Sequence, residues 1–213
     1  MSIKSTISVL SFIIILSIGA LLGFVYGKTS QLTLLNKELV RNGEALNLQL
    51  KNELNHFSNV VKVYSKSSPL ISYLTQPRNA VNTEKINQRL LNAAMAAHAS
   101  QVYLLDLEGI VLAASNWQAQ ESFIGKDFSF RQYVTQAIHV GVGFELAVGV
   151  VSVARGAYFS SLISDANEEL GILVVKADLA HMEQCKHLFG LEQRFSYMVQ
   201  DENEVIFLSN EPS

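Results

Sequence analysis

The first pattern along the chain is an unbroken apolar run close to the N-terminus. Residues 7–26 read ISVLSFIIILSIGALLGFVY, twenty positions without a charged side chain. A helix needs roughly 20 such residues to cross the hydrocarbon core of a bilayer, whereas a cleaved signal peptide has an apolar region of only about 7–15 residues. The run therefore predicts an uncleaved transmembrane helix, with residues 1–6 as a cytoplasmic stub and the long polar remainder exported.

A second pattern, with helical periodicity, follows this run. Apolar side chains recur at steps of three or four positions, with one step of seven, and polar side chains fill the positions between them. The apolar members are Leu32, Leu35, Leu39, Leu46, Leu50, Leu54, Phe57, Val61 and Tyr64. They predict one long amphipathic helix over residues 28–66, and about 35 residues at 1.5 Å each make a rod of roughly 50 Å. We expect this helix to join two copies of the chain as a homodimer.

From residue 101 onward the pattern changes to short runs rich in β-branched and aromatic residues. The runs 101–106 and 110–115 flank the turn Leu107-Glu108-Gly109, which is typical of a β-hairpin. Most strands are joined by turns, which favours an antiparallel sheet flanked by helices, an α+β arrangement, because parallel strands need longer crossover connections. The other elements expected are strands at 143–151, 155–163 and 170–177, helices at 83–99, 128–138 and 179–188, and a loop with one short helical piece at 66–82.

The C-terminal residues repeat the pattern of the first hairpin. Residues 101–115 and 195–209 are both strand, acidic turn and strand, with Asp106 and Asp201 in the middle. We therefore expect a membrane-distal module at residues 67–190 and the beginning of a second, similar module at 191–213. Because no element follows to close the second module, we interpret the sequence as part of a longer protein.

Composition excludes several classes of function. The chain has 16 Lys and Arg against 19 Asp and Glu, a net charge of -3, and lacks the basic stripe of a nucleic-acid binder. A single cysteine, Cys185, excludes an internal disulfide framework and a multi-cysteine zinc site. The five histidines do not have the spacing of a metal-binding motif. No nucleophile–base pair or acid pair stands out, so we expect no catalytic residue, metal or cofactor in this chain.

Two cations are candidate ligand-binding residues. Arg131 lies between Phe130 and Tyr133, and its planar guanidinium is suited to a carboxylate; the alternative is a surface salt bridge. Lys176 is near the end of the most apolar predicted strand, 170–177. Lysine is rarely buried without a partner, so Lys176 either extends to solvent from a sheet edge or points into an anion-binding pocket.

Several motifs together resemble one known family. They are Ala114-Ser115-Asn116-Trp117, Phe123-Ile124-Gly125-Lys126, Phe130-Arg131-Gln132-Tyr133, Arg155-Gly156-Ala157-Tyr158-Phe159 and the run from Gly171 to Leu179. The sequence is similar to the periplasmic sensor of four-carbon dicarboxylate sensor histidine kinases. That family has a double Cache (PAS-like) sensor between two membrane spans, followed by a cytoplasmic kinase core that this chain does not contain.

The resemblance also implies a set of ligand-binding positions. In the family, the arginine of F-R-x-Y and the lysine of V-V-K-x-D-L bind ligand, and they correspond to Arg131 and Lys176. The other positions implied are Phe128, Tyr133, Val150, Ser152 and Tyr158. Phe128 replaces a tyrosine, and Val150 stands where the family has hydroxyl residues after a glycine. Each lost hydroxyl removes a hydrogen bond worth about 0.5–1.5 kcal/mol, which favours a different or less polar carboxylate.

The function that this resemblance and the apolar run 7–26 imply is extracytoplasmic sensing of a small carboxylate, with dicarboxylates as one candidate class, for a two-component receptor in the bacterial inner membrane. Three alternatives stay open on sequence alone. The sensor could serve a chemoreceptor or a cyclic-dinucleotide enzyme, it could be a stand-alone membrane-anchored binding protein, or the chain could be an export-side enzyme.

Overall fold

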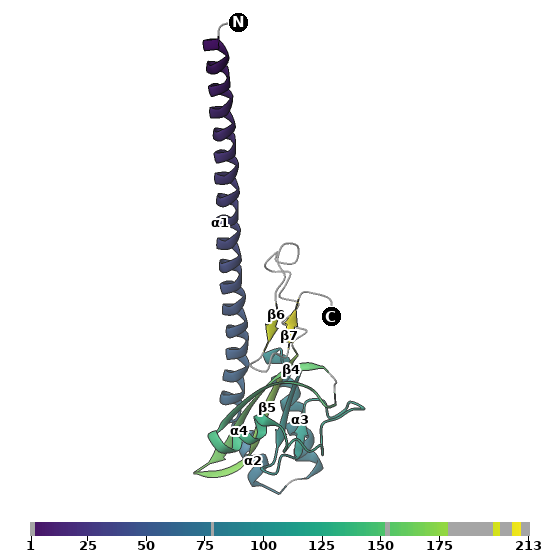
Figure 1. Ribbon diagram of the computed structural model, residues 1–213. Coiled ribbons are helices and arrows are strands. Elements are labelled where there is room, and N and C mark those ends of the chain that lie inside the picture. Colours follow the sequence, from purple (N-terminus) through teal and green to yellow (C-terminus); the bar gives the residue numbers. More distant parts are fainter. Residues whose placement is uncertain (1–2, 78, 152–153, 179–197, 201–205, 210–213) are drawn as a thin grey trace. The chain divides into compact units, whose positions relative to one another are not determined.

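The chain divides into two compact units, residues 1–48 and 49–213 (Figure 1). The computed structural model describes residues 3–77, 79–151, 154–178, 198–200 and 206–209, with side chains from residue 17 to residue 178 within these ranges. The first unit is the N-terminal part of helix α1, which spans Ile3–Tyr64. The expected membrane span, residues 7–26, falls on this helix. Among the described residues, no helix is both long enough and apolar enough to cross a bilayer.

Helix α1 confirms the long helix predicted for residues 28–66, but the apolar stripe on it has two different environments. In the first unit Leu32, Leu35 and Leu39 are exposed. In the second unit Phe57 and Val61 are buried in a hydrophobic cluster. Only the second half of the stripe is therefore a packing surface within one copy of the chain.

The second unit is built on a five-stranded antiparallel sheet, as the turn-rich connections predicted. The strands are β1 (Gln101–Leu105), β2 (Val111–Ala114), β3 (Val142–Val148), β4 (Arg155–Asp165) and β5 (Glu168–Asp178). Their order across the sheet is β2-β1-β5-β4-β3, and every neighbouring pair is antiparallel. Strand β5, which contains the most apolar of the predicted strands, is therefore the central strand.

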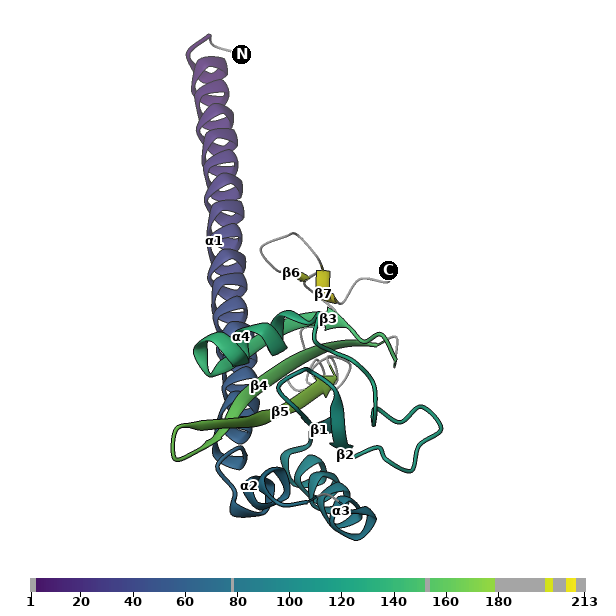
Figure 2. The same ribbon diagram turned by 90° about the horizontal axis from the view of Figure 1, so that it is seen from below.

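Each face of the sheet packs against a different set of helices (Figure 2). Alternate side chains of β5 enter different clusters: Leu173 and Val175 belong to the one that includes α2 (Ser68–Thr75), α3 (Ala80–Ala97) and the end of α1. Ile172 and Val174 belong to the one that includes α4 (Gln132–Val140). The alternation of a β-strand thus produces one structural face and one face with α4.

The short helical piece expected within 66–82 is observed, and the starts of two other helices differ from the sequence expectation. Helix α2 accounts for the short piece expected within 66–82, with a proline in its first turn where a missing N–H costs little. Helix α3 begins at Ala80 rather than residue 83 because the Asn79 side chain accepts a hydrogen bond from Asn82 N. Helix α4 begins at Gln132 rather than residue 128, because Arg131 is extended and acts as the N-cap.

Gly109 is a turn residue that only glycine fits. Its φ is +87°, and a Cβ there would lie 2.6 Å from the backbone Cα of Ser129. The Phe128 N–H donates to the Gly109 carbonyl at 2.9 Å. The first hairpin and the loop that leads to Arg131 are therefore held together through this glycine, which is also why residues 128–130 are not helical.

A second hairpin repeats the pairing of the first. Strands β6 (Met198–Gln200) and β7 (Ile206–Ser209) are antiparallel, with an irregularity between Val199 and Gln200. The β1–β2 pairing has the same irregularity between Leu104 and Leu105. The hairpin predicted in residues 195–209 is confirmed for its described residues, whereas the helix predicted at 179–188 lies outside them.

Candidate functional site

A cluster of five aromatic side chains lines the face of the sheet that carries α4. Tyr103, Phe123 and Phe128 make edge-on ring contacts with centroids 5.4–5.8 Å apart. Tyr133 of α4 stacks on Tyr158 of β4 at 5.2 Å with an interplanar angle of 4°. The Tyr103 and Tyr133 hydroxyls are 2.8 Å apart and hydrogen-bonded. The two halves of the cluster are thereby joined into one rigid aromatic wall.

Arg131 projects its guanidinium over this wall from the start of α4. Its Nη2 donates to the Val148 carbonyl at 2.8 Å, and its Nη1 lies 3.4 Å from Glu145 Oε1. The guanidinium carbon is 5.3 Å from the Phe130 ring centroid and 5.9 Å from that of Tyr158. With its side chain 11% exposed, Arg131 is not the surface salt bridge of the alternative interpretation, although it does form an ion pair.

Lys176 approaches the same ring from the central strand. Its side chain is 2% exposed and its Nζ lies 5.9 Å from the Tyr158 centroid. Nζ is also 2.9 Å from Asp178 Oδ1, so the two side chains form an ion pair. The angles at this contact do not meet the geometry of a hydrogen bond. A Cβ on Gly156 would lie 2.9 Å from Lys176 Cε, so this glycine makes room for the lysine stem. The sheet-edge interpretation of Lys176 is wrong, since β5 is central and the side chain is buried.

Burial shifts the titration of the three tyrosines. It raises the pKa of Tyr158 to about 12, against a smaller lowering by the Arg131 charge. It also raises the pKa of Tyr133 and that of Tyr103. All three hydroxyls are therefore protonated at neutral pH and can act as hydrogen-bond donors.

The space beside these groups is nearly filled by the side chains that line it. The cavity has a volume of about 10 Å³, which is about the minimum for one water molecule. Its lining is Tyr103, Phe123, Phe128, Arg131, Tyr133, Gly149, Val150, Val151 and Tyr158. The structure thus brings together five of the residues proposed from the sequence: Phe128, Arg131, Tyr133, Val150 and Tyr158. Lys176, whose Nζ lies 5.9 Å from the Tyr158 centroid, is not part of the lining, and Ser152 is outside the described residues.

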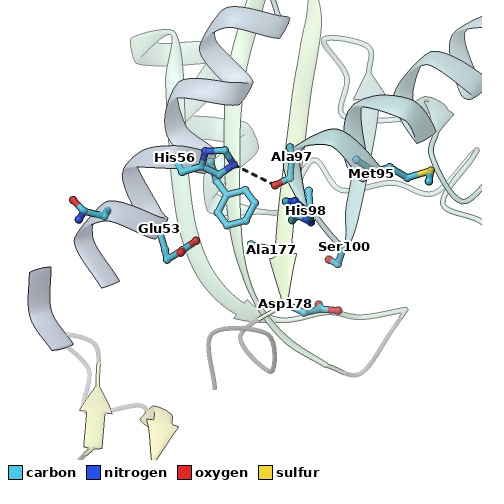
Figure 3. Close-up of a pocket in the computed structure, with 12 residues that line it drawn as sticks. Glu53, His56, Met95, Ala97, His98, Ser100, Ala177 and Asp178 are labelled. Atoms are coloured by element: carbon cyan, nitrogen blue, oxygen red, sulfur yellow. Dashed lines mark hydrogen bonds between the residues drawn. The ribbon is translucent and has the colours of Figure 1, made fainter. Parts of the chain in front are cut away.

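A larger cavity, about 790 Å³, lies at the other face of the sheet (Figure 3). Its polar side chains include Glu53, His56, His98 and Asp178. The His56 ring contacts the Ala97 carbonyl at 3.2 Å. Two carboxylates line this cavity without an arginine or a lysine, so it is poorly suited to a small anion, and the closed cavity at Arg131 is the better candidate despite its size.

Sequence reasoning missed Glu145, Tyr103 and Asp178. Glu145 is the single acidic residue in the otherwise uncharged strand 142–148, and this was the one signal that could have identified it. Tyr103 reaches the site only because β1 pairs with β5 in the register Tyr103↔Val174. That register is a property of the folded sheet.

Comparison with known proteins places the chain in a family. No family model matches the sequence. The chain is similar to the solved sensor domain of the Vibrio cholerae histidine kinase DctB, with 30% identity, a TM-score of 0.76 and coverage of 85% of this chain and 69% of that one. The chain belongs to the DctB sensor-domain family. The Cache-type fold implied by the sequence resemblance is thereby confirmed.

Two curated DctB proteins, each named a C4-dicarboxylate transport sensor protein, also match. The one from Rhizobium meliloti is 37% identical over 100 residues, which are 47% of this chain and 16% of that protein. The one from Pseudomonas aeruginosa is 28% identical over 174 residues, 80% of this chain and 28% of that protein. The chain thus spans less than a third of either DctB protein, and it corresponds to their sensor region.

Proposed function

We propose that the chain is the extracytoplasmic ligand-sensing segment of a sensor histidine kinase, and that its ligands are small carboxylates, with four-carbon dicarboxylates as one candidate class. The observation that carries the proposal is the convergence of two cations on one aromatic ring. Arg131 and Lys176 come from different elements, and each lies 5.9 Å from the Tyr158 centroid. Such cations, largely removed from water beside hydroxyl donors, favour a carboxylate.

The experiment is thermal unfolding of the purified full chain with a panel of mono- and dicarboxylates of two to six carbons. A ligand at 100 times its Kd stabilises the folded state by about 2.7 kcal/mol, which is a rise in Tm of a few degrees for a domain of this size. We expect at least one acid to produce this rise, and Arg131→Ala to abolish it.

Two further variants make the result specific. Lys176→Met removes the second charge but keeps a stem of similar length, so we expect lost binding. Because the variant leaves Asp178 without its cation, we also expect a lower Tm without ligand, and the ligand response is measured relative to that value. Arg89→Ala removes an exposed arginine from α3, on the opposite face of the sheet, and is expected to leave the ligand response intact. If no acid raises the Tm of well-folded protein, the carboxylate proposal is wrong.

We also propose that residues 7–26 anchor the receptor in the bacterial inner membrane, with the sensor on the periplasmic side, and that two copies pair through α1. The uncharged run of twenty residues supports the anchor. Leu32, Leu35 and Leu39, which follow it at coiled-coil spacing and are exposed, support the pairing. The division into a distal module at 67–190 and a second module from 191 is part of the same proposal, supported by the repeated hairpin irregularity.

One crosslinking experiment tests both anchor topology and pairing. Leu35→Cys, in a Cys185→Ser background, is treated in intact cells with a bis-maleimide that does not cross membranes. We expect covalent dimers from Leu35→Cys and few from Leu34→Cys, because Leu34 is exposed but lies off the stripe. A cysteine at 35 that reacts without crosslinking would contradict the pairing, and one that does not react at all would contradict the topology.

A further inference from the structure

The Glu145 carboxylate contacts two groups at the start of α4, the Arg131 guanidinium and the Tyr133 backbone N–H, and each of these groups is able to bind an anion. One carboxylate oxygen is 3.4 Å from Arg131 Nη1, and the other accepts a hydrogen bond from the Tyr133 backbone N–H at 3.3 Å. A guanidinium and a free N–H in the first turn of a helix are groups that bind an external carboxylate. In this chain, a side chain of the protein itself occupies them.

The register of the sheet aligns Glu145 with the second cation. Glu145 on β3 is paired with Tyr158 on β4, and Tyr158 is paired with Lys176 on β5. The three side chains thus form one row across neighbouring strands, in the order anion, aromatic ring, cation. A ligand that spanned from Arg131 to Lys176 would cross Tyr158 with the Glu145 carboxylate beside it.

The formal charges of Arg131, Glu145, Lys176 and Asp178 sum to zero. Arg131 pairs with Glu145, whose side chain is 16% exposed, and Lys176 pairs with Asp178. Because the Arg131 pair is largely removed from water, solvent screens its charges less than it would on the surface. Each negative charge on a ligand is attracted by the cations but is also repelled by Glu145. A second carboxylate on the ligand therefore adds much less binding free energy here than it would at a site with two uncompensated cations.

We propose that Glu145 is a specificity-determining residue that makes the site prefer a small acid with one negative charge over a dicarboxylate. This inference rests on the proposed carboxylate-sensing function and deepens it. The Glu145 carboxylate supplies inside the protein the anion that the second carboxylate of a ligand would otherwise contribute to Arg131.

The test compares two acids of equal length, butyrate with one charge and succinate with two, by calorimetric titration of the purified full chain. In the wild type we expect the tighter binding for butyrate. In Glu145→Gln the amide oxygen still accepts from Tyr133 N–H but the charge is gone. A like charge about 6 Å away at an effective dielectric near 20 is worth roughly 100-fold in affinity. Allowing for solvent, we expect the succinate-to-butyrate Kd ratio to fall at least about tenfold.

A matched control and a second variant make the result interpretable. Glu168→Gln removes the same charge from an exposed position at the far end of β5 and should leave the Kd ratio unchanged. Glu145→Met should shift the ratio in the same direction as Glu145→Gln, and serves if the glutamine variant does not fold. Binding of both acids with an unchanged ratio in the Glu145 variants overturns this inference alone. Absence of saturable binding to every folded variant and to the wild type overturns the proposed function and this inference with it.

Discussion

Replacing Leu173 with alanine is expected to lower the free energy of unfolding by about 2–5 kcal/mol. Leu173 is fully buried on the central strand β5, in the cluster formed with α1, α2 and α3. The substitution removes three carbon atoms and leaves a cavity between the sheet and the three helices. Because these elements surround the cavity, the neighbouring side chains can fill it only in part. Urea unfolding of the purified protein, followed by circular dichroism, measures the change.

The matched control for Leu173 is an apolar side chain that the fold leaves in water. Val81→Ala on α3 changes a residue that is 60% exposed, and surface substitutions of this kind usually stay within about 0.5 kcal/mol of the wild type. A decrease in the free energy of unfolding below 1 kcal/mol for Leu173→Ala would contradict the tight packing between the sheet and these helices that the structure shows.

Stability is expected to fall steeply between pH 10 and pH 12. Burial raises the pKa of Tyr158 from its ordinary value near 10 to about 12, and raises those of Tyr103 and Tyr133 as well. Below pH 10 the tyrosines are protonated in both the folded and the unfolded chain, and the stabilisation is fully present. Above pH 10 the unfolded chain releases these protons and the folded chain retains them, so unfolding becomes progressively more favourable.

The amount by which the free energy of unfolding falls at alkaline pH follows from the size of the pKa shifts. Two pKa units at Tyr158 alone correspond to roughly 2–3 kcal/mol, most of which is lost by pH 12, and the other two tyrosines add to it. Urea midpoints at pH 7, 9, 10, 11 and 12 measure the trend. Tyr158→Phe should give a shallower decline above pH 10 than the wild type, while any change in its stability at pH 7 reports packing alone. Parallel declines in the two proteins would show that Tyr158 does not retain its proton in the folded state.

The order and type of the elements in the sensor unit were largely predictable from the sequence. The turn at Gly109 separates two apolar runs, and the structure confirms the hairpin. Helix ends were less predictable because they depend on caps. Asn79, rather than Thr83, is the N-cap of α3, and its side chain accepts a hydrogen bond from a backbone N–H of the first turn. At Arg131, the bond from Phe128 N–H to Gly109 delays the helix by four residues, and that bond joins segments that a local pattern does not relate.

The candidate site was predictable in its cations but not in its charge balance. Arg131 and Lys176 could be selected because a lysine in an apolar strand and an arginine among aromatic residues are unusual. Their partners could not, since Glu145 reaches Arg131 from an edge strand and Asp178 is one residue beyond the predicted end of β5. The small volume of the cavity also had no signal in the sequence.

By itself, the sequence determined the α+β class, the long helix, the strand alternation and the two cations, because hydrophobic periodicity and the cost of burying charge are local properties of a chain. Only the tertiary structure decided which anion each cation meets. Register aligns Glu145, Tyr158 and Lys176 across three strands, and register follows from the packing of the whole sheet. The charge that a ligand can bring to this site therefore depends on residues that are neighbours only in the folded protein.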